Sequence, residues 1–64
     1  MKIDNIKLGV LLVRHDWNYR DLVRESKVSK ATISSIKNGK SCSFLTAVKI
    51  ADALGVEVTE ILED

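Results

Sequence analysis

Apolar residues recur every three to four positions along most of the chain, a spacing that predicts amphipathic helices. Five segments follow this pattern, with expected bounds at residues 5–14, 19–25, 30–37, 44–54 and 58–62. No stretch alternates between apolar and polar residues as a half-buried strand does. The pattern therefore predicts an all-α protein, a compact five-helix domain that occupies residues 1–64 as a single unit.

Each of the first four segments begins at or just after a residue that favours the N-terminal cap of a helix. The expected caps are Asn5, Asn18, Ser29 and Ser43. The expected inward-facing residues are Leu8, Leu11 and Leu12; Leu22 and Val23; Ile33 and Ile36; Leu45, Val48, Ala51 and Leu54; and Val58, Ile61 and Leu62. Gly9 disfavours the first helix, which suggests that another helix packs closely against it.

The second and third segments are joined by only three residues, 26–28. Two short helices with such a link have the geometry of a helix-turn-helix motif, whose second helix enters the major groove of DNA. The outward face of residues 30–37 carries Lys30, Ala31, Ser34 and Ser35, flanked by Thr32 and Lys37. Small side chains suit a helix that must fit a groove about 12 Å wide.

The segment from Val28 to Lys40, VSKATISSIKNGK, resembles the recognition-helix signature of the phage-repressor and Cro-like (XRE) family. Residues 45–56 resemble the fourth helix of the same family, and the resemblance extends over about residues 6–62. It implies a lambda-repressor-like domain of five helices that binds operator DNA, usually as a dimer.

The resemblance also implies roles for individual residues. Base edges would be contacted by Lys30, Ala31, Ser34 and Ser35. Phosphates would be contacted by Asn18, Tyr19, Ser29, Thr32, Asn38, Lys40, Ser43 and Phe44. The alternatives are that Lys30 and the two serines are ordinary solvated surface residues, and that Tyr19 only covers Trp17.

Some positions depart from the pattern of the family. Many members have Gln, Ala and Gly where this chain has Tyr19, Val23 and Lys27. A frequent Arg–Glu ion pair maps onto Leu12 and Lys37. Because both partners are replaced, no charge is left alone, and we expect an apolar contact for Leu12 and a Lys37 that is free to face solvent or phosphate.

Charge is distributed unevenly along the chain, although the net charge is only +1. Residues 1–40 hold nine Lys and Arg against four Asp and Glu, whereas residues 41–64 hold one Lys against five acids. The N-terminal part, at +5, suits a polyanion. Chance segregation of charge on a solvated surface is the alternative.

Other classes of function find little support in the sequence. Cys42 and His15 lack partners at catalytic or metal-binding spacing, so we expect no enzyme, no metal site and no cofactor. No apolar run approaches the roughly 20 residues of a membrane span, and no signal peptide is recognisable. We expect a cytoplasmic protein without a membrane partner.

Two functions remain. The first is a sequence-specific transcription regulator, a repressor or Cro-like switch that reads double-stranded DNA as a homodimer. The second is an antitoxin or another protein-interaction module that uses the same fold, suggested by the acidic and apolar C-terminal region. For the homodimer, the expected interface is the apolar face of the last helix, Val58, Ile61 and Leu62.

Overall fold

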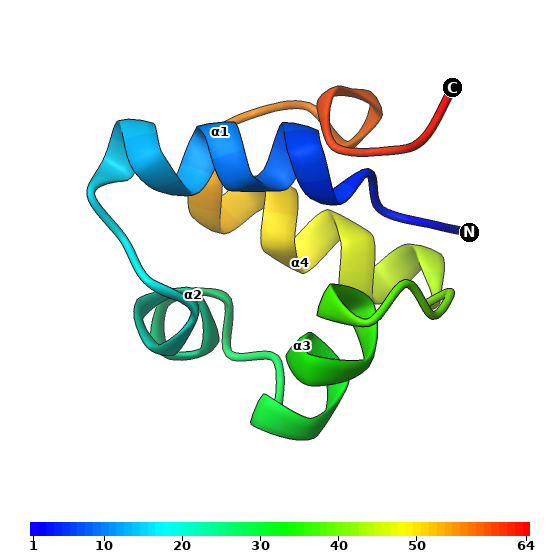
Figure 1. Cartoon of the computed structure of the whole chain (residues 1–64), viewed down its shortest axis with the longest axis horizontal. Coiled ribbons are helices and arrows are strands. Elements are labelled where there is room, and N and C mark those ends of the chain that lie inside the picture. Colours follow the sequence, from blue (N-terminus) through cyan, green and yellow to red (C-terminus); the bar gives the residue numbers. More distant parts are fainter.

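The computed structural model describes residues 1–64 and consists of four α-helices and one 3-10 turn (Figure 1). The elements are α1 (Asn5–His15), α2 (Tyr19–Ser26), α3 (Lys30–Lys37), α4 (Phe44–Leu54) and η1 (Val58–Glu60). Helix α4 crosses the middle of the molecule, with α1 on one side and α2 and α3 on the other (Figure 1). The predicted all-α architecture is confirmed. None of the helices has the length and apolar character needed to cross a membrane.

The expected fifth helix is wrong, because residues 58–62 form only the single 3-10 turn η1. Five residues are too few to stabilise an α-helix by their own hydrogen bonds. The chain after η1 instead runs antiparallel to the N-terminal segment, where Ile3 and Leu62 form an isolated bridge. The Asp4 amide donates to the Ile61 carbonyl at 2.8 Å, and this pairing carries the Ile61 side chain into the core.

Thirteen apolar residues form the core, and they come from all four helices, the link between α2 and α3, and both termini. The predicted inward residues of α1 and α3 are buried, and so is Leu22 of α2, whereas Val23 is half-buried. The stripe predicted for α4 is partly wrong, because Leu45 is 63% exposed and Val48 is half-buried. The buried residues of α4 are Ala47, Ile50, Ala51 and Leu54. Two alanines on this face let the surrounding elements approach the central helix closely.

The N-cap of helix α1 lies one residue earlier than expected. The side chain of Asp4, not Asn5, accepts hydrogen bonds from the amides of Ile6 and Lys7. The Asn5 side chain instead donates from Nδ2 to the Ile36 carbonyl at 3.0 Å, which ties the start of α1 to the end of α3. The opposite end of α1 is tied to α4, because His15 Nε2 lies 2.9 Å from the Leu54 carbonyl.

The link between α2 and α3 is short and its conformation is well defined. Lys27 terminates α2 in the left-handed conformation, with φ of 60°, and its amide donates to the Val23 carbonyl. Val28 follows and is buried, and its amide donates to the hydroxyl of Ser26 at 3.3 Å. This turn fixes the angle at which α3 leaves α2 and therefore sets the direction of the outer face of α3.

Candidate nucleic-acid interface

The outer face of α3 is polar, cationic and made mostly of small side chains. Ile33 and Ile36, both nearly inaccessible to solvent, hold the inner face of the helix on the core. Lys30, Ala31 and Ser34 are exposed on the opposite side, and Ser35 is half-buried at its edge. An α-helix with its side chains is about 10–12 Å across, which matches the width of the major groove.

The N-terminus of α3 is capped by a pair of hydroxyl groups. Ser29 Oγ accepts from the Thr32 amide at 3.2 Å and donates its own hydrogen to Thr32 Oγ1 at 2.9 Å. The Thr32 hydroxyl hydrogen stays free to donate, and the amides of the first helical residues point along the axis without intrahelical acceptors. Such a helix end attracts anions, because free N–H groups and the helix dipole act together.

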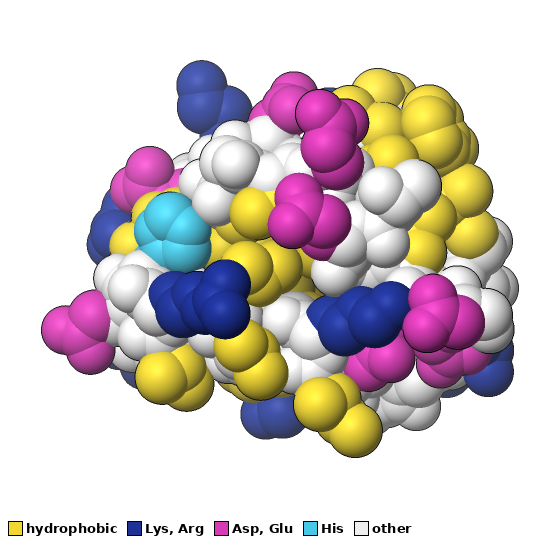
Figure 2. Space-filling view, turned by 90° about the horizontal axis from the view of Figure 1, so that it is seen from above, with side chains coloured by type: hydrophobic (Ala, Val, Ile, Leu, Met, Phe, Trp, Pro, Cys, Tyr) yellow, Lys and Arg dark blue, Asp and Glu magenta, His cyan; other side chains and the backbone are white.

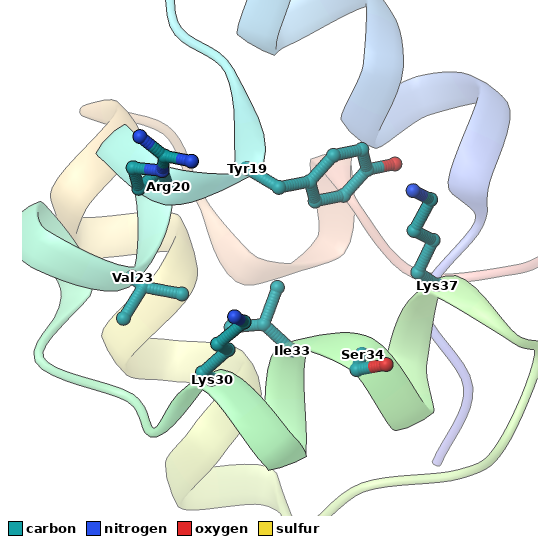
Figure 3. Close-up of a pocket in the computed structure, with 7 residues that line it drawn as sticks. All are labelled: Tyr19, Arg20, Val23, Lys30, Ile33, Ser34 and Lys37. Carbon is teal, nitrogen blue, oxygen red and sulfur yellow. The ribbon is translucent and has the colours of Figure 1, made fainter.

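A groove of about 290 Å³ lies between α2 and α3 (Figure 3). Its polar rim carries three cationic side chains, Arg20 from α2 and Lys30 and Lys37 from α3. Figure 3 shows the first two on one side of the groove and Lys37 on the other, across from the hydroxyl end of Tyr19. Three cations without an acid among the lining residues make this groove a place for an anionic ligand.

Tyr19 is half-buried, and its ring contacts a cation. The Lys37 ammonium lies 4.8 Å from the centroid of the ring, a cation–π contact. Lys37 is exposed, as expected, but it is held over the ring and is not free. Leu12 stands at the other position of the ion pair that many family members have, and it is buried in the core as predicted.

The N-terminus of α2 is closed by a reciprocal pair of hydrogen bonds. The Asn18 side chain accepts from the Asp21 amide at 2.9 Å, and the Asp21 carboxylate accepts from the Asn18 amide at 3.0 Å. Arg24 lies 3.1 Å from Asp21 and 3.1 Å from Glu25, and these neighbours raise the pKa of its guanidinium, Glu25 contributing most. The ion pair offsets the negative charge of Asp21 at this helix end.

The C-terminus of α3 and the N-terminus of α4 are joined by an exposed loop. Gly39 adopts φ of +86°, and the Lys40 amide donates to the Ser35 carbonyl at 3.0 Å. Ser43 caps α4 as Ser29 caps α3, accepting from the Thr46 amide and donating to the Thr46 hydroxyl. Asn38, Lys40, Ser43 and Phe44 are all exposed.

Of the cations of this surface, Arg20 is not among the residues expected to contact DNA, and Lys37 is expected only to face solvent or phosphate. Neither is conspicuous in the sequence, because the groove that they line forms only when α2 and α3 pack together. The available signal was the spacing of Lys30 and Lys37, seven residues apart and therefore on one side of the helix.

The chain offers little for other chemistry. No three His, Cys, Asp or Glu residues gather to hold a metal ion. Cys42 is a free, half-buried cysteine, and desolvation raises the pKa of its thiol, an effect that the nearby N-terminal ammonium opposes. A thiol with a raised pKa is a poor nucleophile at neutral pH.

In a comparison with known protein families, the model of the Cro/C1-type HTH DNA-binding domain matches residues 7–64. The match includes all of α2, α3 and α4, and nearly all of α1. Comparison with curated proteins and with solved structures gives no match.

Proposed function

Because the chain belongs to the Cro/C1-type HTH DNA-binding domains, we propose that it is a sequence-specific transcription regulator that reads the major groove with α3. The observation that carries the proposal is the outer face of α3, where small polar side chains and Lys30 stand opposite two buried isoleucines. A lysine can donate to guanine acceptors, and the methyl group of Ala31 can pack against a thymine methyl. Ser34 and Ser35 complete the proposed base-reading set.

In the proposed complex, phosphates are held around this face by helix ends, hydroxyls and cations. Arg20, Lys37 and Lys40 neutralise charge on the flanks, while the N-termini of α2, α3 and α4 present amides. The residues proposed to contact phosphate directly are Asn18, Tyr19, Ser29, Thr32, Asn38, Lys40, Ser43 and Phe44. Binding of this kind would repress transcription by occluding a promoter, as a repressor or Cro-like switch does.

Selection from a pool of random DNA duplexes, followed by mobility shift of the enriched sites, tests this proposal. We expect an enriched half-site and an affinity that falls steeply with salt. Four cations, Arg20, Lys30, Lys37 and Lys40, predict a slope of log K against log salt of about −3 to −4 for each bound copy. A pool without enrichment, or a slope close to zero, would contradict the proposal.

The second candidate is an antitoxin or other protein-binding module, and the observation that favours it is an exposed apolar surface, although this surface is not the expected C-terminal one. The C-terminal residues expected to bind a partner are largely used by the chain itself, since Ile61 is fully buried and Val58 and Leu62 are half-buried against the core. An exposed apolar face exists, but it lies on α1. Co-expression with the product of the neighbouring gene would favour this candidate if a complex formed that excluded DNA.

A further inference from the structure

Helix α1 is apolar on both of its faces. Leu8, Leu11 and Leu12 are buried in the core, as in any amphipathic helix of a small domain. On the opposite side, Ile6 is 80% exposed and Val13 is 79% exposed, with Val10, 47% exposed, between them. Figure 2 looks onto the side of the molecule that α1 and the C-terminal segment form, where hydrophobic side chains stand among Lys and Arg along one border. The spacing of these three residues is that of a helix-packing stripe.

Gly9 lies at the edge of the same exposed stripe. A Cβ atom at this position would meet no other atom of the chain within 4 Å, and the backbone is ordinary α-helix. The expectation that another helix of the chain packs closely on Gly9 is therefore wrong. Glycine weakens a helix relative to alanine, and nothing inside this chain requires it here. A helix from outside the chain would use the missing side chain, because axes approach more closely over a small residue.

A shallow groove of about 230 Å³ runs beside the stripe and carries charges of both signs. Its lining includes Arg14 and Glu60, together with Ile6, Lys7, Val10 and Leu11. Lys7 is paired with Asp64 at 3.2 Å, whereas Arg14 forms no ion pair in the chain. A two-fold axis through the middle of α1 brings Arg14 of each copy toward the end of α1 where Glu60 of the other copy lies. The surface is thus complementary to itself in charge as well as in apolar character.

We propose that this α1 face, Ile6, Gly9, Val10 and Val13, binds the same face of a second copy, with the two α1 helices antiparallel. The inference deepens the proposed function and rests on it, since it assigns the homodimer that reads two half-sites. Ile6 of one copy lies against Val13 of the other, and the two Gly9–Val10 steps meet at the axis. The occupant is a second copy because the groove beside the stripe offers both Arg14 and Glu60, neither of which forms an ion pair within the chain, and the two-fold axis brings these opposite charges together across the pair.

The antiparallel arrangement is compatible with one DNA duplex. Asn5, on one flank of α1, contacts the end of α3, and Lys7, on the other flank, contacts the carbonyl of Leu62. The two-fold axis of antiparallel helices runs from flank to flank. Both copies of α3 therefore lie on the same side of the dimer, as a palindromic operator requires.

The interface is small. Helix α1 has 11 residues and is about 16 Å long, so the pair buries less than the roughly 1,000 Å² of a stable dimer. We therefore expect weak association of the free protein and cooperative binding of two copies to adjacent half-sites, where DNA raises their effective concentration.

Disulfide trapping tests the arrangement. In a Cys42→Ser background, which removes the native thiol, Val10→Cys places one thiol beside the proposed axis. The matched control is Leu45→Cys in the same background, a residue that is 63% exposed on α4. We expect mild oxidation to link Val10→Cys into dimers at least ten times faster than the control, and faster still on a duplex with two half-sites. Equal rates, or faster linkage through residue 45, would overturn the proposal.

Substitution of Gly9 supplies a second test with effects of opposite sign. Gly9→Gln adds a helix-favouring residue in open space, so the melting temperature of the dilute protein should rise by about 4–8 °C. The same side chain obstructs the proposed contact, so cooperativity between half-sites should fall at least tenfold while binding to one half-site is unchanged. Unchanged cooperativity would overturn the inference and leave the proposed function intact. If the unsubstituted protein did not bind even a single half-site, the proposed function itself would be wrong.

Protection of the Val10→Cys thiol from alkylation by a different protein would show that the α1 face has another occupant. If co-expression yields a heteromer in which Val10→Cys resists alkylation, the face belongs to that partner and the pairing of two copies is wrong.

Discussion

The outer faces of α3 and α1 are both exposed, and each belongs to a helix whose inner face packs into the same core. The α3 face carries Lys30 and serines, whose polar groups suit the water, phosphates and base edges of a DNA groove. The α1 face carries Ile6, Val10 and Val13, and burial of these side chains away from water lowers the free energy. The comparison teaches that polarity separates two interfaces that exposure alone would not distinguish.

The largest effect is expected at Ile61. A substitution there tests whether the C-terminal segment serves the core or, like the α1 face, offers an apolar surface to a partner. Because Ile61 is 0% exposed, Ile61→Ala should lower the free energy of unfolding by about 2–5 kcal/mol, which is a large part of the stability of so small a domain. Chemical denaturation measures this loss. Glu63→Ala, at an exposed neighbouring position, serves as control. A fully stable Ile61→Ala protein with impaired association would restore the C-terminal interface.

The next effect separates the two faces directly. Lys30→Ala should weaken operator binding by about 1–3 kcal/mol and relax the preference at one base position, without changing self-association. Val13→Glu should abolish cooperativity while leaving half-site affinity unchanged, because a charge enters the apolar pairing face but lies away from α3. Lys49→Ala, an exposed cation on α4, controls for charge alone. Titrations on single and paired half-sites measure both quantities, and variants that fail in both assays would show that the faces are not separate.

The smallest effect concerns the turn between α2 and α3, which sets the direction of α3. Lys27 is held at φ of 60°, a conformation that disfavours residues with a side chain by roughly 1–2 kcal/mol. Lys27→Gly removes this strain but adds freedom to the unfolded chain, so we expect a net stabilisation of about 0.5–1 kcal/mol. Thermal unfolding measures it, with Lys2→Gly at the exposed N-terminus as the control for charge. Destabilisation would mean that the lysine side chain supports the turn.

The sequence predicts elements best where the local signals are explicit. Asn18, Ser29 and Ser43 each cap a helix as expected, because an N-cap depends on a side chain and on amides two or three residues away. The expected cap of α1, Asn5, is wrong, and Asp4 takes its place, since Asp and Asn are both favourable N-cap residues. The choice depends on the contact of Asn5 with Ile36, which is remote in sequence.

The failures also have physical causes. The first half of α4 has apolar residues on two faces, Leu45 and Val48 on one and Ala47 and Ile50 on the other, and the packing of neighbouring elements buries the second face. Ile61 shows helical spacing, yet terminal pairing decides its burial. For the candidate site, the outward face of α3 follows from periodicity, whereas Arg20 joins the groove only through tertiary packing.

The pairing of Ile3 with Leu62 also bears on the order in which the molecule assembles. Nearly the whole chain must form a loop before these two residues can meet, and closing a loop carries an entropy that grows with its length. The contacts of α2 with α3 join neighbouring segments and incur far less of this entropy. The helix-turn-helix unit can therefore form early, whereas the two ends of the chain pair late, and the opening of this pairing would expose Ile61.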